Sequence, residues 1–419
     1  MCYLDSYHIR GGRRIGGQIK VSGAKNAALP ILAAAVLTGS ESFLGNCPQI
    51  SDVENMLEIL RRLGCKVNRT ADGILVDSKG LIACEVSHEL TGELRSSVFL
   101  LGPMLARCGE VILGQPGGCA IGLRPINLHL SALRSLGAEI EERDGMVICT
   151  AKKLTGGKIN LDFPSVGATE NAMLAALGAT GETMILNSAK EPEIVDLQDY
   201  LVACGARIKG AGTGTIHIEG GHTLHDVHHN ILPDRIEGGT FLAAAAATGG
   251  DLLLEGTRPL HMSSLLQHLE KCGCFVKCYE DKVLLDAPER LKAIDYVVTE
   301  PYPGFPTDMQ SQFLTLMAIA GGRSCIREEI FENRFKYVSE LNKMGARIEI
   351  RNKNAIIDGV SSFHGQHVEA KDLRGGAALV IAGLIAEGET IIDNIEYIER
   401  GYHKFDEALR TLGADIQKK

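Results

Sequence analysis

The stretch from Gly114 to Leu128 has the residue types that most directly suggest reaction chemistry. It contains four glycines, one cysteine, Cys119, and an arginine five residues later, Arg124. Glycines let the main chain approach a ligand closely, and a permanent cation favours a nearby thiolate. The stretch therefore predicts a reactive thiol beside an anion site. The alternative is a glycine-rich turn whose cysteine packs in the core, as free cysteines commonly do.

Cations near the ends of apolar segments indicate what kind of ligand the protein binds. Lys25 and Asn26 stand at a predicted helix start, where free backbone N–H groups and the helix dipole favour an anion. Guanidinium binds phosphate and carboxylate bidentately, so the set suits a ligand that carries both groups. The alternative is that each is an ordinary solvated charge, or a helix cap in the case of Asn26. The six cations of this kind are Lys25, Arg95, Arg124, Arg334, Arg374 and Arg400.

Two aspartates stand in comparable places, each shortly after a proline and just ahead of a predicted helix. They are Asp234 in LPDRIEGGTF and Asp308 in PGFPTDMQSQF. An aspartate there commonly caps the helix, whereas a carboxylate that faces a cationic cleft is a candidate general base. We expect one of the two to be a cap and the other a base. The spacing does not choose between them.

Composition limits the class of protein. The chain has 419 residues, a formal charge of −9 and a mean hydropathy of +0.05. This length predicts two domains, and the negative charge argues against nonspecific nucleic-acid binding. We expect a soluble protein without a transmembrane helix, because no apolar run is long enough to span a bilayer. The first residues do not resemble an export signal, so we expect a cytoplasmic protein whose twelve cysteines are reduced thiols.

Internal repeats predict the fold. A helix that ends at glycine and leads into a strand occurs six times, with the glycines 68 to 73 residues apart. An Ala/Leu-rich helix that ends at glycine before a short apolar strand alternates with this pattern. Because that helix is apolar nearly all round, we expect an α/β protein whose helices pack inside sheets, in two domains of three units. The six repeat glycines are Gly64, Gly137, Gly205, Gly273, Gly345 and Gly413.

The repeats also suggest where the domains divide. We expect one domain over residues 24–231, which includes the cysteine loop, and a second made of residues 1–23 and 232–419. A predicted strand from Ile15 to Val21 would complete the second domain. Two crossovers, near Ala24 and Asn230, would join the domains and leave a cleft between them, the usual place for a ligand.

Several cysteines and histidines resemble metal ligands, but another interpretation is favoured for each group. Cys65, Cys204, Cys272 and Cys274 occupy repeat positions filled elsewhere by Ala, Leu or Met, so packing is favoured for the run that ends at Cys278. The histidines of the second crossover are more simply explained by a solvated linker. No metal site is assigned. These histidines are His222, His225, His228 and His229.

From about Ile15 to Gln417 the chain resembles the UDP-N-acetylglucosamine 1-carboxyvinyltransferase family of enolpyruvyl transferases. The matching stretches include GAKNAALP, GGCAIGLRP, DFPSVGATEN, LPDRIEGGTF, FPTDMQSQF, FENRF, DLRGGAALV and IERGY. The resemblance implies a two-domain inside-out α/β barrel, with six repeated units of about 70 residues. It also implies enolpyruvyl transfer from phosphoenolpyruvate to UDP-N-acetylglucosamine in peptidoglycan synthesis, without a cofactor. The sister family, 5-enolpyruvylshikimate-3-phosphate synthase, lacks the GGC loop.

The resemblance also implies roles for particular residues. Cys119 would be the acid at the phosphoenolpyruvate methylene and the thiol that fosfomycin alkylates, and Asp308 would be the base on the sugar hydroxyl. Lys25 and Arg400 would join them as catalytic residues. The implied substrate-binding residues are Lys25, Asn26, Arg95, Arg124, Pro125, Ile126, Asn127, Leu128, Ser165, Val166, Gly167, Asp308, Ile330, Arg334, Arg374 and Arg400.

Two positions depart from the family pattern. Phe163 stands where the family often has a lysine, which removes one expected diphosphate contact, and Asn127 stands where aspartate is frequent. An asparagine still offers a carbonyl acceptor and adds an N–H donor. These departures predict altered nucleotide affinity rather than altered chemistry. The two alternative functions are transfer to a shikimate-type acceptor and a non-catalytic copy that only binds the sugar nucleotide.

Overall fold

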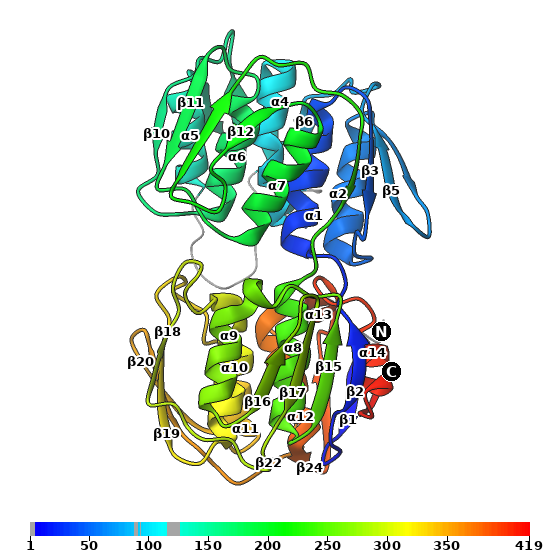
Figure 1. Cartoon of the computed structure of the whole chain (residues 1–419), viewed down its shortest axis with the longest axis vertical. Helices are drawn as coiled ribbons and strands as arrows, with labels where there is room; N and C mark the ends of the chain where they lie inside the picture. Colours follow the sequence, from blue (N-terminus) through cyan, green and yellow to red (C-terminus); the bar gives the residue numbers. More distant parts are fainter. Residues whose placement is uncertain (1–4, 88–90, 93, 115–125) are drawn as a thin grey trace. The chain divides into compact units, whose positions relative to one another are not determined.

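The computed structural model describes residues 5–87, 91, 92, 94–114 and 126–419. They form two compact units. The N-terminal unit comprises the described residues from Gly23 to Leu232 (Figure 1). The C-terminal unit comprises the described residues up to Ser22 together with Pro233–Lys419.

Three buried helices form the centre of the N-terminal unit. Nearly every residue of the first and third is buried, which explains their apolar sequences. The three are α1 (Lys25–Ala34), which η1 (Ala35–Leu37) continues, α4 (Leu101–Cys108), which η2 (Arg95–Leu100) precedes, and α6 (Val166–Ala176). A second helix of each repeat packs on one of the buried helices. These are α2 (Ser51–Arg62) on α1, α5 (Asn127–Ser135) on α6, and α7 (Pro192–Ala203) on α1.

The C-terminal unit repeats this arrangement, with three helices that contact one another at its centre (Figure 1). They are α8 (Arg235–Ala247), α10 (Gln310–Ile319) and α12 (Leu373–Ile385). The second helices are α9 (Ser263–Lys271), α11 (Val338–Lys343) and α14 (Phe405–Thr411). The short helices are η3 (Pro259–Met262), η4 (Thr307–Met309) and α13 (Glu396–Glu399).

Each unit has three four-stranded sheets. In the N-terminal unit the strands are β3 (Glu41–Gly45), β4 (Lys66–Arg69), β5 (Gly73–Asp77), β6 (Glu85–Val86), β7 (Glu110–Gly114), β8 (Glu139–Arg143), β9 (Met146–Thr150), β10 (Lys158–Asn160), β11 (Glu182–Leu186), β12 (Arg207–Lys209), β13 (Thr215–Glu219) and β14 (Val227–Asn230). Their orders are β14-β3-β5-β4, β6-β7-β9-β8 and β10-β11-β13-β12.

The sheets of the C-terminal unit follow the same plan. Their strands are β1 (Tyr7–Arg10), β2 (Gly17–Lys20), β15 (Asp251–Glu255), β16 (Phe275–Cys278), β17 (Lys282–Asp286), β18 (Tyr296–Val298), β19 (Arg323–Arg327), β20 (Arg347–Arg351), β21 (Asn354–Asp358), β23 (His367–Glu369), β25 (Glu389–Asp393) and β26 (Asp415–Lys418). The orders are β16-β17-β15-β2, β18-β19-β21-β20 and β23-β25-β1-β26. A small parallel pair joins β22 (Phe363–His364) to β24 (Ala386–Glu387).

All six four-stranded sheets share one pairing pattern, which confirms the predicted repeat. In the first sheet β14 pairs with β3 in parallel, whereas β5 pairs with both β3 and β4 in antiparallel fashion. In the sixth sheet β1 takes the place of β5, because it pairs antiparallel with both β25 and β26. The sequence prediction covers β2, which pairs with β15, but misses β1. That strand has only four residues, and both its antiparallel partners lie near the other end of the chain.

The six repeat glycines end the second helices as predicted. Their φ angles lie between +96° and +101°, a left-handed conformation that favours glycine, and each leads into the next strand. The four predicted core cysteines are buried, as expected: Cys65 and Cys204 in the N-terminal unit, and Cys272 and Cys274 in the C-terminal unit.

The packing interpretation is wrong for Cys278, which is exposed at the end of an edge strand. The solvated-linker interpretation is wrong for His229. This residue lies in β14, and its Nε2 is 3.1 Å from Asp196 Oδ1. Its side chain is only 13% exposed, because the ring also packs edge-on against Tyr200.

Candidate functional site

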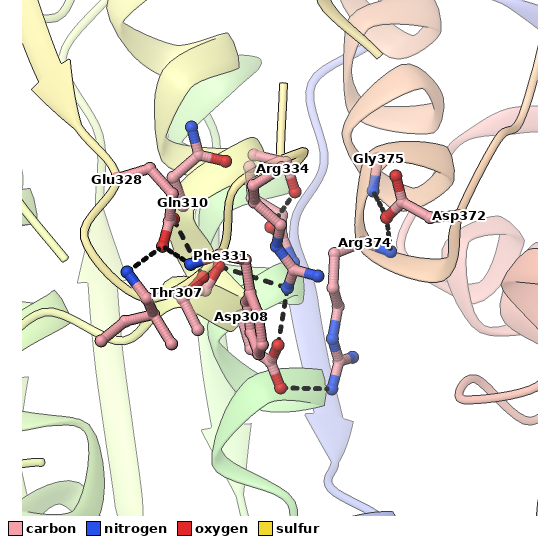
Figure 2. A network of polar contacts seen from close by, with 12 residues as sticks. Thr307, Asp308, Gln310, Glu328, Phe331, Arg334, Asp372, Arg374 and Gly375 are labelled. Carbon is pink, nitrogen blue, oxygen red and sulfur yellow. Dashed lines mark hydrogen bonds and ion pairs between the residues drawn. The ribbon is translucent and has the colours of Figure 1, made fainter. Parts of the chain in front are cut away.

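Asp308, Arg334 and Arg374 form a charged cluster in the C-terminal unit. Arg334 Nη2 donates to Asp308 Oδ1 at 2.6 Å, and Arg374 Nη2 donates to Asp308 Oδ2 at 3.3 Å, as Figure 2 shows. Each arginine side chain is 4% exposed, whereas that of Asp308 is 28% exposed. Three residues that the sequence analysis singled out in separate segments therefore meet. Two guanidiniums thus share one carboxylate, and guanidinium N–H groups are the donors that phosphate and carboxylate ligands bind.

Glu328 links the segment that contains Asp308 to the segment that contains Ile330. Its buried carboxylate accepts from the Thr307 hydroxyl at 2.9 Å and from the backbone N–H groups of Ile330 at 2.8 Å and Phe331 at 3.0 Å (Figure 2). The turn that carries Asp308 is thus fixed to the loop that carries Ile330.

Glu328 is not among the residues predicted from the sequence, although a signal for it is present. Alternate residues of a strand point to the same face, and Ser324 and Ile326 of β19 are buried. Extending this alternation by two residues places Glu328 on the buried face.

The structure assigns the cap role to Asp234. Its Oδ1 accepts from the N–H groups of Ile236 at 2.8 Å and Glu237 at 3.0 Å, at the start of α8. Asp308 instead lies within η4, which has Pro306 at its N-cap, and faces the two guanidiniums. The two aspartates that looked equivalent in the sequence therefore differ, and Asp308 is the candidate base.

Arg374 is held at both its backbone and its side chain. Asp372 caps α12 by accepting from the N–H groups of Arg374 at 3.0 Å and Gly375 at 2.9 Å. At the other end, Arg374 Nη1 donates to the Tyr402 oxygen at 3.2 Å. Burial opposes the charge, but Asp308 and Tyr402 outweigh it and raise the pKa of Arg374 above its usual range. Arg374 is a permanent cation with a fixed direction.

Arg400 lies at the C-cap of α13, two residues before Tyr402. The short α13 packs on α12, the helix that begins with Leu373 and Arg374. Arg400 therefore belongs to the same part of the C-terminal unit as the charged cluster. Tyr402 is the last residue of the IERGY stretch, and the sequence alone does not indicate a role for it.

In the N-terminal unit, Lys25 forms an ion pair that the sequence analysis missed. Lys25 Nζ lies 2.6 Å from Asp52 Oδ2, and the two side chains are 12% and 3% exposed. Lys25 begins α1, and Asp52 lies in the first turn of α2. The N-cap of α1 is Ala24, so Asn26 is not the cap of this helix. The amide of Asn26 is therefore not committed to helix capping.

The two segments that the family resemblance assigns to sugar-nucleotide binding lie at the starts of neighbouring helices. Ile126, Asn127 and Leu128 begin α5, and Ser165, Val166 and Gly167 begin α6, where Ser165 is the N-cap. An added Cβ on Gly167 would lie 2.8 Å from Cε1 of His129, so only glycine fits without a shift. Helix α5 therefore approaches α6 closely at this point.

Asn171 links these helices to the segment of Arg95. Its Nδ2 donates to the Val98 carbonyl at 3.0 Å and to His129 Nδ1 at 2.8 Å, and its Oδ1 accepts from the Gly102 N–H at 2.8 Å. Because both amide hydrogens are donated, His129 Nδ1 accepts and its Nε2 carries the proton. Arg95 begins η2, three residues before Val98. A fully buried amide thus fixes three segments that the sequence analysis assigned to substrate binding.

Three predicted site residues, Cys119, Arg124 and Pro125, lie outside the described residues. Across residues 5–87, 91, 92, 94–114 and 126–419, no group of three His, Cys, Asp or Glu side chains has the arrangement of a metal site. Within the same ranges, no helix combines the length and apolar character that crossing a membrane requires.

The fold is that of the enolpyruvyl transferases. The enolpyruvyl transferase NikO from Streptomyces tendae matches with a TM-score of 0.90 and 27% identity, over 99% of both chains. An EPSP synthase from Acinetobacter baumannii matches over 100% of both chains with a TM-score of 0.76 and 20% identity, which supports the fold alone. The predicted fold class is therefore confirmed.

Sequence relatives narrow the family. The sequence model of EPSP synthase (3-phosphoshikimate 1-carboxyvinyltransferase) matches residues 9–409. UDP-N-acetylglucosamine 1-carboxyvinyltransferase 2 of Caldanaerobacter subterraneus is 49% identical over 99% of both chains. UDP-N-acetylglucosamine 1-carboxyvinyltransferase 1 of Symbiobacterium thermophilum is 50% identical over 99% of this chain and 95% of its own. The chain belongs to the EPSP synthase family and, within it, to the UDP-N-acetylglucosamine 1-carboxyvinyltransferases.

Proposed function

We propose that the protein transfers the enolpyruvyl group of phosphoenolpyruvate to the 3-hydroxyl of UDP-N-acetylglucosamine and releases phosphate. The observation that carries this proposal is the 49% identity, over 99% of both chains, to a relative named for the transfer. The reaction commits the sugar nucleotide to peptidoglycan synthesis and takes place in the cytoplasm. No cofactor takes part.

Phosphoenolpyruvate carries a phosphate and a carboxylate, and the proposal assigns Lys25, Asn26, Arg124, Arg374 and Arg400 to these groups. The buried guanidinium of Arg374 supports this assignment, since a fixed and partly desolvated cation binds an oxyanion more strongly than a solvated one. Lys25 is similarly sheltered, and Asp52 fixes the direction of its side chain.

The proposal assigns the sugar nucleotide to Arg95, residues 124–128, residues 165–167, Asp308 and Ile330. Arg334 is a substrate-binding residue beside Asp308. The close approach of Gly167 to His129 supports a shared surface at the starts of α5 and α6. Phe163, where the family often has lysine, is 41% exposed and adds no charge near this surface. We therefore retain the prediction that the affinity for the nucleotide differs while the chemistry does not.

The reaction needs a base on the sugar hydroxyl and an acid at the methylene carbon of phosphoenolpyruvate. Asp308 takes the hydroxyl proton as the oxygen attacks C2, and Cys119 delivers a proton to C3, which gives a tetrahedral ketal. The ketal then loses a proton from C3, the bond from C2 to the phosphate oxygen breaks, and the enol ether forms. The surrounding cations stabilise the phosphate as it leaves.

The geometry of Asp308 is compatible with this role. An ionised carboxylate offers about four acceptor sites, and the two arginines occupy one on each oxygen. The 28% exposure of the side chain lets a substrate hydroxyl approach the carboxylate.

Phosphate release from phosphoenolpyruvate tests the proposal directly. We expect release only when UDP-N-acetylglucosamine is present, together with a nucleotide product whose mass has increased by one enolpyruvyl group. Release that requires shikimate 3-phosphate instead would favour the shikimate-type alternative. Binding of UDP-N-acetylglucosamine without any release would favour the non-catalytic alternative.

A further inference from the structure

A buried chain of hydrogen bonds lies behind Arg374, at the centre of the C-terminal unit. Arg374 Nη1 contacts the Tyr402 oxygen at 3.2 Å, and this oxygen lies 2.8 Å from Thr240 Oγ1. Gln312 Nε2 lies 3.1 Å from Thr240 Oγ1 and 3.5 Å from the Tyr402 oxygen. Thr240, Gln312, Tyr402 and Arg374 are all buried, and three of them come from the central helices α8, α10 and α12.

One assignment of donors and acceptors satisfies every contact in this chain. Thr240 has one hydroxyl hydrogen, which it donates to the Ile236 carbonyl at 2.8 Å. In this assignment Tyr402 donates its own hydrogen to Thr240, and its oxygen accepts from Arg374. Gln312 supplies a second donor to Thr240, whose oxygen is then fully used. One lone pair of the phenol oxygen is thus turned toward the guanidinium.

Packing prevents the phenol from turning away. The Tyr402 ring stacks on Phe405, with ring centroids 4.6 Å apart and an interplanar angle of 28°. The Arg374 Cζ atom lies 5.7 Å from the centroid of the Tyr402 ring. Burial raises the pKa of Tyr402, although Arg374 opposes this effect, so the side chain remains a neutral phenol that keeps its hydrogen.

We propose that Tyr402 is a positioning residue, which aims the Arg374 guanidinium at Asp308 and at the phosphoenolpyruvate anion. This inference rests on the proposed function. Arg374 has five N–H donors, and Tyr402 and Asp308 each take one from a different nitrogen. Contacts at both terminal nitrogens hold the guanidinium in place. The remaining donors then face a substrate oxyanion without further reorganisation, which is the condition for strong electrostatic stabilisation.

The N-terminal unit shows that a buried polar centre does not need a tyrosine and an arginine. There Asn171 and His129 join the buried helices through one amide and one imidazole. The C-terminal unit has instead the more costly arrangement of a desolvated cation, which a merely structural role would not require. The competing explanation is that the bond between Tyr402 and Arg374 only stabilises the fold. Substitution of Tyr402 distinguishes this explanation from a positioning role.

Tyr402→Phe in the full-length protein removes the phenol oxygen and keeps the ring. We expect kcat/KM for phosphoenolpyruvate to fall about 10- to 100-fold, the usual effect of losing a hydrogen bond to a charged group. The KM for UDP-N-acetylglucosamine should change less than about threefold, because Arg374 is assigned to the other substrate. Tyr200→Phe is the matched control: Tyr200 is equally buried, and its hydroxyl lies 2.9 Å from Ser42 Oγ. Tyr200→Phe should lower the stability of the protein by a similar amount and leave its turnover unchanged.

A double-mutant cycle with Arg374→Lys shows whether Tyr402 acts through Arg374. We expect Tyr402→Phe to have little further effect in the Arg374→Lys background, because the oriented guanidinium is already gone. Equal effects of Tyr402→Phe and Tyr200→Phe on turnover, or a full effect of Tyr402→Phe in the lysine background, would overturn the inference. If Tyr402→Phe does not fold, Thr240→Val tests the same chain, and unchanged turnover in that variant would refute the inference. If the proposed function itself were wrong, the wild-type protein would release no phosphate, so the two failures can be distinguished.

Discussion

Arg334 holds Asp308 by two contacts with the same short turn. Its Nη2 donates to Asp308 Oδ1 at 2.6 Å and to the Thr307 carbonyl at 3.3 Å. The arginine thereby fixes both the side chain of Asp308 and the backbone that carries it, as Figure 2 shows. This contact, rather than helix capping, orients the Asp308 side chain. A mutation can therefore distinguish the role of Asp308 from that of a helix cap.

Asp308→Asn should fold normally, bind UDP-N-acetylglucosamine and turn over at least about a hundredfold more slowly. Asparagine keeps the shape of the side chain but loses the base. If Asp308 were only structural, the change would cost stability and leave turnover almost intact. Phosphate release measures turnover, and calorimetry measures nucleotide binding.

Asp406→Asn is a suitable control for this experiment. Asp406 Oδ2 accepts from Arg410 Nη2 at 2.7 Å, so the control also breaks a carboxylate–guanidinium pair in the C-terminal unit. We expect it to keep normal turnover. Near-normal turnover in a well-folded Asp308→Asn protein would place the base elsewhere.

Cys119 should be the thiol that a small anionic epoxide such as fosfomycin modifies fastest. Reaction needs thiolate, and burial raises the pKa of other thiols, among them Cys47 to about 12 and Cys274 to about 11. The pKa of the exposed Cys278 is also raised. Peptide mapping after brief labelling measures the site. Loss of activity in step with modification of Cys278 rather than Cys119 would contradict this prediction.

Much of the fold could be predicted because its signals are local. The glycine at the end of each second helix is needed for one backbone angle, and its recurrence reveals the six units. Strand β1 was missed because its partners β25 and β26 come from the last part of the sequence, and four residues carry little pattern of their own.

Sequence patterns suggest candidate site residues but do not reveal the partner of each one. The proline and helix signals around Asp234 and Asp308 are alike, and only the turn that follows each one decides which becomes a cap. Likewise Tyr402 stands in a motif that was noted, yet its link to Thr240 depends on packing between α8 and the C-terminal segment. Such contacts join residues far apart in the sequence, so spacing does not reveal them.

Gly167→Ala should weaken binding of UDP-N-acetylglucosamine and destabilise the protein by about 1–3 kcal/mol. The added methyl would lie 2.8 Å from His129, which is buried and bonded to Asn171, so the ring cannot move without breaking that contact. Calorimetry measures the affinity, and urea unfolding measures the stability.

Gly157→Ala is the matched control for this substitution, since an added Cβ there meets no atom within 4 Å. We expect it to bind the nucleotide normally. If Gly167→Ala had the same nucleotide affinity and the same stability as Gly157→Ala, the close approach of α5 to α6 would be unimportant for function.

Glu237 should make the stability of the C-terminal unit depend on pH. Burial and the neighbouring Asp234 raise the pKa of Glu237 to about 8, against opposition from the Ser22 N–H, which donates to its Oε2 at 2.6 Å, and from Arg374. The folded protein therefore keeps a proton that the unfolded chain releases at its ordinary pKa of 4.5. A raised pKa of this kind stabilises the fold fully below the unfolded pKa, and the contribution is lost as the pH rises through the folded pKa.

Glu237→Gln should therefore flatten the pH dependence of unfolding between about pH 5 and 8. Glutamine resembles the protonated acid and still offers Ser22 an acceptor, but it has no proton to lose. The wild type should lose at most about 1.4 kcal/mol per pH unit across this window, and the variant should lose less. Urea unfolding of the full-length protein at several pH values measures both slopes. Glu349→Gln, at an exposed glutamate paired with Arg351, is the control and should keep the wild-type slope. A Glu237→Gln protein with an unchanged slope would show that Glu237 is already ionised in the folded protein.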